Sequence, residues 1–288
     1  MKKNRENLWK NTGANLALII IFIFVLFPIF WVFTLAFKSR PDILTWPPKF
    51  IFTPTFENFK NILISGTSGS SAGSTTVNFI LYFKNSLIIS VGSIIVSLLV
   101  GIPASYAIAR WNFKGKEDIA FTFLTFRFAP PLMVIIPIYV IFRKLGLLNT
   151  YIGMIWVYQL ITLPMIIWIL RGYFEDISNE LEEACLVDGY HQWQAFFKII
   201  LPLVKPGIAA SSLLAFIYAW NNFIFAMILG GSDVQPITVA SLQFMTAEAI
   251  RYGDMAAACV IAAIPALILA IYSQKHLIRG LSLGAVKE

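Results

Sequence analysis

The stretch LALIIIFIFVLFPIFWVFTLAF, residues 16–37, is 22 residues long and carries no charged side chain. The hydrocarbon core of a bilayer is about 30 Å thick, and a helix needs roughly 20 apolar residues to cross it. Five further apolar runs lie at residues 86–109, 119–142, 152–170, 207–230 and 255–274. None alternates with a period of two, which excludes a membrane β-barrel. The sequence therefore predicts an all-α, polytopic membrane protein with six transmembrane helices in one domain, residues 1–288.

The composition agrees with a membrane environment. Hydrophobic residues make up 58% of the chain and charged residues 13%, whereas a soluble domain carries about 25% charged residues. These proportions exclude a soluble enzyme and a disordered chain. The net charge of +7 is explained by cations in cytoplasmic loops. We expect no nucleic-acid partner, because no basic run is interleaved with aromatic residues that could stack on bases.

The distribution of Lys and Arg predicts the orientation. Cations gather at the N-terminus, at residues 110–116, at residues 171–205 and in the C-terminal tail, all on one predicted side. Short loops rich in Lys and Arg face the cytoplasm, so both termini are predicted to be cytoplasmic. The first apolar run is too long for a signal peptide and lacks a small-residue cleavage site, so we expect it to remain as a span.

No sequence motif indicates catalysis or metal binding in this chain. The glycine- and serine-rich stretch at residues 66–74 lacks the Gly-Lys-Ser/Thr ending of a phosphate-binding loop, and a flexible external loop is the better interpretation. The two cysteines form no Cys-x-x-Cys pair and have no histidine at ligand spacing. We expect no catalytic residue, no bound metal and no cofactor in the chain.

Residues 175–206 are too polar to span a membrane and too apolar for a plain linker. Asp176 and Ser178 are good N-cap types, and acidic residues at 180, 182 and 183 suit a helix N-terminus. Gly189 can end that helix in a left-handed conformation, and a second amphipathic stretch follows. The segment predicts two short helices that meet at a sharp turn. These residues alone leave two interpretations open: a helix pair on lipid headgroups, or a docking site for a partner.

A family resemblance favours the second interpretation, a docking site for a partner. The spacing of Glu183-Ala184, Gly189 and the Ile199-x-Leu201-Pro202 stretch resembles the EAA loop in the membrane subunits of binding-protein-dependent ABC importers. Cys185 stands where a second alanine is common. The resemblance extends over nearly the whole chain and is closest to the maltose-type carbohydrate uptake branch. It also rests on five further stretches: Ala129-Pro130-Pro131, residues 145–150, Ala219-Trp220-Asn221-Asn222-Phe223, residues 252–257 and the tail from Arg279 to Lys287.

The resemblance implies partners and a mechanism. It implies a bacterial or archaeal plasma membrane, a second, unlike permease subunit, two ATPase subunits that bind ATP and Mg, and an extracytoplasmic solute-binding protein. In such importers the EAA helix sits in a groove of the ATPase and transmits its closure to the membrane subunits. The resemblance implies that residues 175–206 couple the chain to the ATPase, and they are called here the coupling segment. The residues implied to make this coupling are Glu182, Glu183, Ala184, Asp188 and Gly189. A disaccharide, an oligosaccharide or a polyol is the expected solute.

Four residues are candidates for the solute path. Arg127 is the only full charge inside an apolar run, and such a residue faces either a cavity or a partner. Asn221 and Asn222 lie mid-span beside Tyr218, and Tyr218 and Asn222 would share a helix face at i,i+4. Amides and aromatic rings suit a neutral polyhydroxyl ligand. The alternative, that the amides hydrogen-bond between helices and only pack the bundle, stays open.

Two rival classes fit the sequence less well. An ion-coupled secondary transporter would need buried carboxylates, and a membrane-embedded enzyme would need His or acid clusters at depth; the predicted spans contain neither. A scaffold subunit without a transport role is compatible with the spans. It leaves the two predicted helices of residues 175–206 without a purpose.

Overall fold

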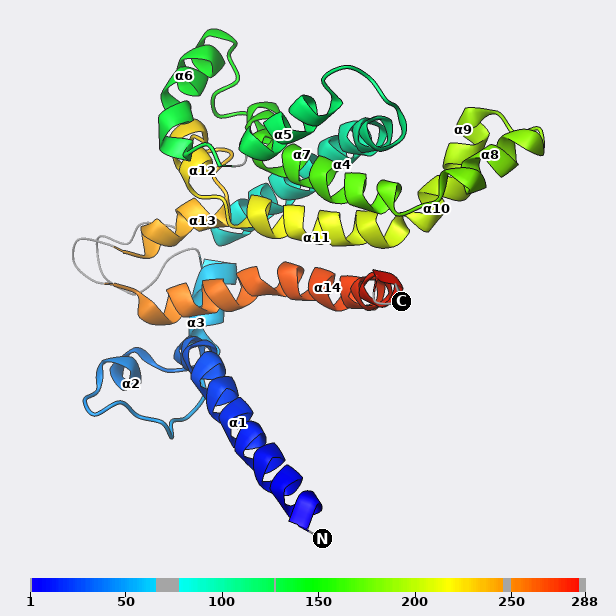
Figure 1. Ribbon diagram of the computed structural model, residues 1–288. Helices are drawn as coiled ribbons and strands as arrows, with labels where there is room; N and C mark the ends of the chain where they lie inside the picture. Colours follow the sequence, from blue (N-terminus) through cyan, green and yellow to red (C-terminus); the bar gives the residue numbers. More distant parts are fainter. Residues whose placement is uncertain (1, 66–77, 127, 246–249, 285–288) are drawn as a thin grey trace. The chain divides into compact units, whose positions relative to one another are not determined.

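A computed structural model of the chain describes residues 2–65, 78–126, 128–245 and 250–284. Within these ranges, side chains are described for residues 14–64 and for residues 78–274. The described residues form helices joined by turns, with one isolated antiparallel bridge between Met245 and Ile250. In chain order the elements are α1 (Lys2–Ala36), α2 (Arg40–Leu44), α3 (Glu57–Lys60), η1 (Asn61–Ser65), α4 (Phe79–Arg110), α5 (Lys116–Phe126), α6 (Pro131–Lys144), α7 (Tyr151–Glu175), α8 (Asn179–Val187), α9 (Gln192–Ala195), η2 (Phe196–Ile200), α10 (Leu201–Leu203), α11 (Lys205–Trp220), α12 (Ile224–Leu229), α13 (Ile237–Ala240), η3 (Ser241–Phe244) and α14 (Tyr252–Gly284) (Figure 1).

The chain divides into two compact units, which are described separately. Unit 1 comprises Met1–Phe79 and Gln243–Ala262, and unit 2 comprises Ile80–Leu242 and Ala263–Glu288. Unit 1 holds α1 and the connection that follows it. Unit 2 holds the helices on either side of the coupling segment, together with the segment itself.

The predicted all-α membrane fold is confirmed. Four helical stretches are long and apolar enough to cross a membrane: Ala14–Ala36, Phe79–Arg110, Tyr151–Glu175 and Tyr252–Gln274. Two bent helix pairs raise the number to as many as six. The predicted spans 86–109, 152–170 and 255–274 lie inside α4, α7 and α14, and span 16–37 extends one residue beyond α1.

The third predicted span, residues 119–142, forms two helices, which together are long and apolar enough for one broken span. The structure divides it into α5, which ends at Phe126, and α6, which begins at Pro131. Pro130 and Pro131 have no backbone N–H to donate, and a residue before proline is disfavoured in the helical region, so a helix cannot continue through this pair. Pro131 instead occupies the first turn of α6, where a missing N–H costs nothing.

The fifth predicted span, residues 207–230, is likewise divided between two helices. Helix α11 ends at Trp220, and α12 begins only at Ile224. Asn221 occupies the C-cap of α11, and its side-chain amide donates to the carbonyl of Ile217 at 2.8 Å. An asparagine that hydrogen-bonds to nearby backbone competes with the helical ladder, which explains the interruption.

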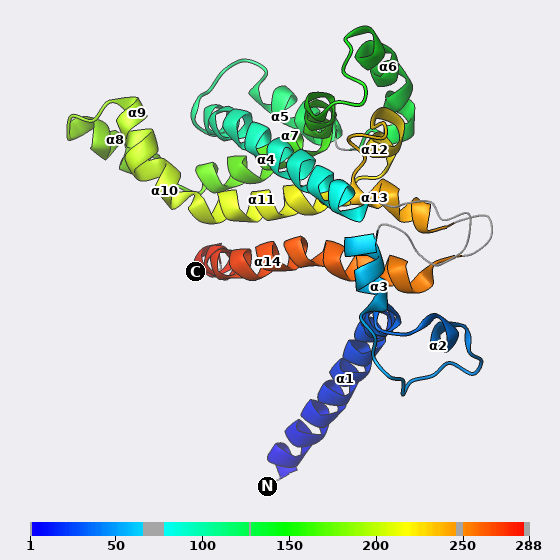
Figure 2. The ribbon, with the colours of Figure 1, turned by 180° about the vertical axis from the view of Figure 1, so that it is seen from behind.

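The core of unit 2 lies where α7 meets α4, α6, α11 and α12 (Figures 1 and 2), and its buried members include Ile89, Ile135, Tyr158, Ala219 and Phe225. Helix α7 also packs against both α5 and α11. Gln159 of α7 joins it to α4: its amide donates to the carbonyl of Ser93 at 3.1 Å, and it accepts from Ser97 at 2.5 Å. A Cβ at Gly207 would lie 2.5 Å from the Tyr173 ring, so only glycine allows α11 this close to α7. The two helices that flank the coupling segment are therefore tightly packed together.

Candidate functional site

The first helix of the coupling segment, α8, begins at a side-chain cap. Ser178 is the N-cap, and its hydroxyl accepts a hydrogen bond from the backbone N–H of Glu180 at 3.2 Å. Glu180 and Glu182 follow in the first turn, where negative charge complements the positive end of the helix dipole. Asp176, the other predicted cap, instead ends α7 as its C-cap.

The same helix ends in a Schellman motif. Gly189 has φ +87°, its N–H donates to the carbonyl of Leu186 at 3.1 Å, and the N–H of Tyr190 donates to the carbonyl of Cys185 at 3.0 Å. This pair of bonds satisfies the last carbonyls of the helix and requires a residue that tolerates positive φ. The predicted left-handed end at Gly189 is confirmed, and α8 is capped at both ends.

Glu182 faces the chain itself rather than solvent. Its Oε2 lies 3.2 Å from Nε of Arg110, the last residue of α4, and its Oε1 accepts a hydrogen bond from the Tyr106 hydroxyl. Arg110 also donates to the carbonyl of Ile177 at 2.9 Å and to the Asn179 side chain. These contacts attach the start of α8 to the end of α4.

A ring cluster attaches the second helix of the segment to the same place. The Tyr106 ring centroid lies 4.6 Å from that of Phe196 in η2 and 5.4 Å from that of Phe174 at the end of α7. Phe174 and Phe196 are both buried. Tyr106 therefore contacts two elements of the coupling segment, α8 through its hydroxyl and η2 through its ring.

Tyr106, Arg110 and Phe174 are not among the site residues predicted from the sequence. Arg110 contributes to those predictions only through the charge of its loop. The contacts that give these residues a role join positions 76 residues apart in the chain, as in the hydrogen bond between Tyr106 and Glu182. The sequence offered one signal for this contact: Arg110 ends the apolar run 86–109, and residues 180–183 on the same predicted side of the membrane are rich in acids.

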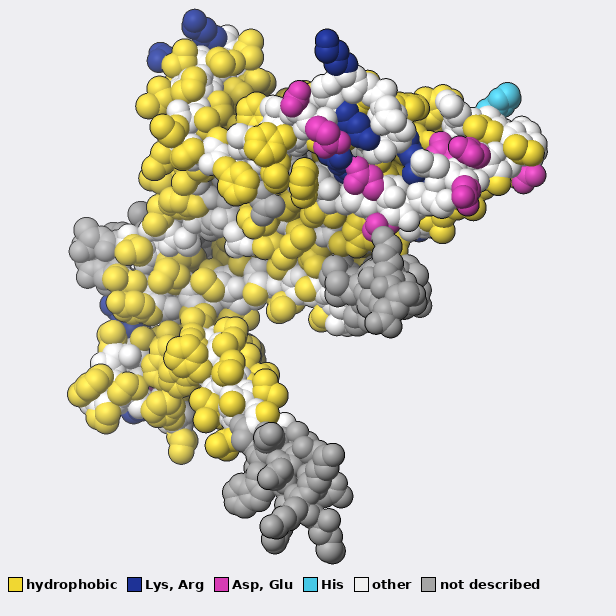
Figure 3. Space-filling model, in the orientation of Figure 1, with side chains coloured by type: hydrophobic (Ala, Val, Ile, Leu, Met, Phe, Trp, Pro, Cys, Tyr) yellow, Lys and Arg dark blue, Asp and Glu magenta, His cyan; other side chains and the backbone are white. Residues whose placement is uncertain are grey.

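The other four residues of the predicted coupling set lie on the surface. Glu183, Ala184, Asp188 and Gly189 are all exposed. They share this surface with large apolar side chains, of which Val187 is 87% exposed and Trp193, in α9, is 71% exposed. Acidic side chains gather over α8 in the space-filling view (Figure 3). Helix α8 thus presents an acidic and apolar surface on one face, while Glu182 on its other face attaches it to α4.

The candidates for the solute path are not brought together on one helix face. Arg127 lies outside the described residues. Tyr218 is exposed on α11, and because α11 ends at Trp220, the expected i,i+4 relation with Asn222 does not hold. The side chain of Asn221 bonds to Ile217, as described above. The side-chain oxygen of Asn222 is buried and has no hydrogen-bond partner among the described residues.

A second group of polar side chains lies at the opposite end of α4, and is called here the polar end cluster: Asn85, Asn149, Tyr151 and Asp233. Asn85 donates to the carbonyls of Asp233 and Gln235 at 2.9 and 3.0 Å and accepts from the Tyr151 hydroxyl at 2.6 Å. The amide of Asn149 donates to the Asp233 carboxylate at 2.8 Å. Asn85 and Arg110 are 25 positions apart on one helix, about 38 Å at 1.5 Å per residue.

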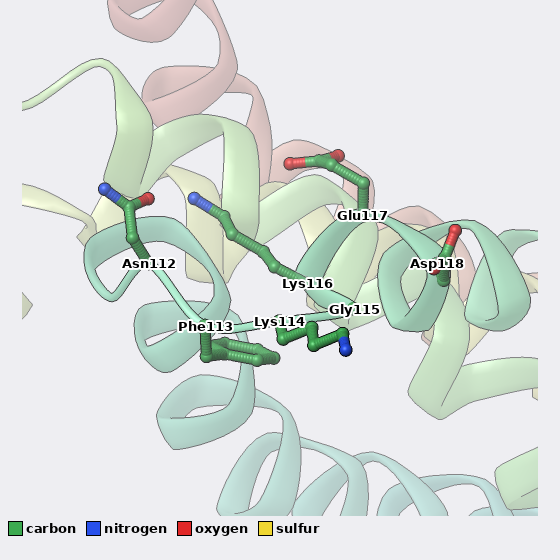
Figure 4. Close-up of a pocket in the computed structure, with 7 residues that line it drawn as sticks. All are labelled: Asn112, Phe113, Lys114, Gly115, Lys116, Glu117 and Asp118. Carbon is green, nitrogen blue, oxygen red and sulfur yellow. The ribbon is translucent and has the colours of Figure 1, made fainter.

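A surface hollow lies in the connection between α4 and α5. It is lined by residues 112–118 alone, and Figure 4 shows the Lys116 side chain extending toward Asn112. The hollow is open and built from one short stretch of chain, and it contains none of the solute-path candidates. It is therefore unsuited to enclosing a solute. Within the described residues, no three His, Cys, Asp or Glu side chains gather as metal ligands would.

The geometry defines a class of protein: a multi-pass helical membrane protein with an acidic, doubly capped helix fixed at one end of its bundle. Comparison with known proteins identifies the family. Residues 97–283 match the binding-protein-dependent transport system inner membrane component family, and the chain belongs to that family. The match includes the whole coupling segment.

Known relatives cover nearly the full chain. The diacetylchitobiose uptake system permease protein of Streptomyces coelicolor is 33% identical, over 98% of this chain and 99% of its own length. The trehalose/maltose transport system permease protein of Thermococcus litoralis is 32% identical, over 98% of this chain and 99% of its own length. A bacterial ABC transporter involved in the import of the polysaccharide alginate contains a chain of the same fold, with TM-score 0.74, 24% identity, and 92% and 95% of the two chains covered.

Proposed function

We propose that the chain is one of two unlike membrane subunits of an ATP-driven sugar importer. The family is binding-protein-dependent, and relatives of the same length carry names that specify diacetylchitobiose or trehalose and maltose. A disaccharide, an oligosaccharide or a polyol fits this pattern as the solute. ATP and Mg would bind to two separate ATPase subunits, and a solute-binding protein outside the cell would deliver the solute.

The exposed surface formed by Glu183, Ala184, Asp188 and Gly189 carries this proposal. It lies on a helix whose two ends are capped and whose inner face is fixed by Glu182 to Arg110. A helix held in this way keeps its shape when a partner pushes on it. A displacement of α8 would pass to α4 through Arg110 and Tyr106, and to the end of α7 through Phe174.

The charge of α8 favours a protein partner over a lipid surface. The helix and its C-cap contain Glu180, Glu182, Glu183 and Asp188, and no Lys or Arg. Helices that lie on membranes are rich in Lys and Arg on their polar face, and the cytoplasmic leaflet is negatively charged. An acidic helix is repelled by that surface, whereas a groove with cationic residues on an ATPase attracts it.

The two ends of α4 then face opposite compartments. The Arg110 end, with the coupling segment and the cationic connection at residues 110–116, would face the cytoplasm. Both chain termini are proposed to lie on this side. The polar end cluster would face outward, where the binding protein docks.

Co-purification and uptake test the proposal together. The chain is expressed with its partner permease and ATPase subunits, extracted in mild detergent and recovered by a tag on this chain. The ATPase should be recovered with the wild type and lost with Gly189→Pro, because proline cannot adopt positive φ or donate to Leu186. Glu183→Lys should abolish uptake while the protein still inserts.

Glu57→Lys serves as the matched control, because Glu57 is an exposed acid on α3, in unit 1, outside the coupling segment. This variant should retain both the ATPase and uptake. Normal uptake by Glu183→Lys and Gly189→Pro would overturn the assignment of the coupling segment. Recovery of no ATPase with a folded wild-type chain would overturn the proposed function.

A further inference from the structure

The connection between α1 and α3 in unit 1 folds back along the end of α1. The N–H of Thr55 donates to the carbonyl of Phe37 at 2.8 Å. The ring of Phe50 meets that of Trp31 edge to face, with 5.7 Å between centroids. The connection therefore does not project away from the helix that precedes it.

The contact with Trp31 sets the depth of this connection in the membrane. Trp31 lies five residues before the end of α1 at Ala36, about 8 Å along the axis. The apolar stretch of α1, Ala14–Ala36, has 23 residues and is about 35 Å long, slightly more than the roughly 30 Å hydrocarbon core. A segment beside Trp31 thus lies at the boundary between hydrocarbon and headgroups.

The same connection exposes large apolar side chains. Trp46 is 87% exposed and Ile51 is 95% exposed, and Leu44 and Phe50 are each 64% exposed. Between residues 44 and 56 the only charged residue is Lys49, whose Nζ lies 2.7 Å from Asp42. The surface is therefore apolar and its one charge is paired.

A second lysine of the connection is buried, whereas Arg40, the first residue of α2, is exposed. Lys38, the second residue beyond α1, has a side chain that is only 1% exposed. Its Nζ lies 4.3 Å from the centroid of the Trp31 ring and 5.1 Å from that of Phe52. The faces of aromatic rings attract a cation, and burial lowers the pKa of Lys38. The Lys38 ammonium is therefore covered by aromatic rings and is not on the surface of the connection.

We propose that residues 44–51 lie in the interfacial layer of the bilayer, with Trp46 and Ile51 among the phospholipids of the leaflet where α1 ends. The surface continues the apolar face of α1, whose most apolar stretch is not buried by any of the described residues. Tryptophan concentrates at membrane–water interfaces because its ring is apolar and its N–H can bond to headgroups or water. The segment anchors α1 at a fixed depth.

Depth-dependent quenching tests the anchor. In the full chain with Cys185→Ala and Cys259→Ala, single cysteines replace Trp46 or Ile51 and carry a nitrobenzoxadiazole label. The protein is reconstituted in phosphatidylcholine vesicles containing lipids brominated near the headgroup. Both labels should lose most of their emission to the brominated lipids and little to aqueous iodide.

Glu57→Cys is the control, since Glu57 is exposed and charged on α3; its label should respond to iodide. Iodide quenching at positions 46 and 51 would overturn the proposal. Loss of lipid quenching at both positions once the partner subunits are assembled would identify a protein as the occupant and also overturn it. The inference depends only on α1 crossing the bilayer, so lipid quenching in a chain that imports no sugar would still support it.

Discussion

Glu182 of α8 and Arg110 of α4 form an ion pair at the end of the unit 2 bundle, with 3.2 Å between Oε2 and Nε. Their side chains are 16% and 8% exposed. The pair fixes which face of α8 points inward. The exposed face, with Glu183 and Asp188, is then the one that a partner can reach. The adjacent acids Glu182 and Glu183 thus have different environments and should behave differently when neutralised.

We predict that Glu182→Gln lowers the free energy of unfolding of the purified chain by about 3 kcal/mol, because removing one member of a largely buried pair leaves Arg110 uncompensated. Glu183→Gln should change it by less than about 0.5 kcal/mol, as expected for a surface substitution. Thermal unfolding in detergent measures both variants. Equal destabilisation by the two substitutions would contradict the assigned orientation of α8.

We predict that Gly189→Ala reduces ATPase recovery and uptake. A non-glycine residue in the left-handed region costs about 1–2 kcal/mol, and here the cost falls on the cap that shapes the exposed surface. Gly115→Ala is the matched control, because Gly115 has φ +84° and, like Gly189, open space around an added Cβ. It should cost similar stability and leave uptake intact, as measured by sugar accumulation in vesicles.

We predict that Asn222→Ala lowers the uptake rate several-fold without loss of the bound ATPase. A buried amide oxygen without a partner costs about 1–3 kcal/mol, so its removal should not destabilise the chain. Asn221→Ala removes only the bond to Ile217 and should transport at close to the normal rate. Unchanged transport by Asn222→Ala, together with lower thermal stability, would favour a packing role.

We predict that Asn85→Ala is among the more destabilising single changes in unit 2. Asn85 is fully buried, and the substitution removes its three hydrogen bonds, to the carbonyls of Asp233 and Gln235 and from the Tyr151 hydroxyl, each with a net contribution of about 0.5–1.5 kcal/mol. Tyr151→Phe removes one bond of the three and should cost less. The melting temperature of Asn85→Ala should therefore be lower than that of Tyr151→Phe. The reverse order would contradict a stabilising role for Asn85 in the polar end cluster.

The sequence predicts what depends on local chemistry. Runs of apolar residues locate four of the spans because a bilayer demands about 20 such residues whatever the neighbouring helices do. The end of α8 at Gly189 is equally local, since only a few residues tolerate the positive φ of a Schellman motif. Ser178 as the N-cap follows from its own hydroxyl.

The sequence does not predict what depends on contacts between distant residues. Two apolar runs look continuous, yet the prolines at 130–131 and the amide of Asn221 interrupt them. The roles of Tyr106 and Arg110 follow only from where α4 ends relative to α8. The polar end cluster likewise joins Asn85 to Asp233, which are 148 positions apart.

The exposed apolar residues of the coupling segment bear on how the cell handles the chain before assembly. Val187 and Trp193 would stand in water on any copy that lacks its partner, and such surfaces favour aggregation and recognition by quality control. An orphan subunit should therefore be short-lived, and its abundance should follow the supply of the partner rather than its own rate of synthesis.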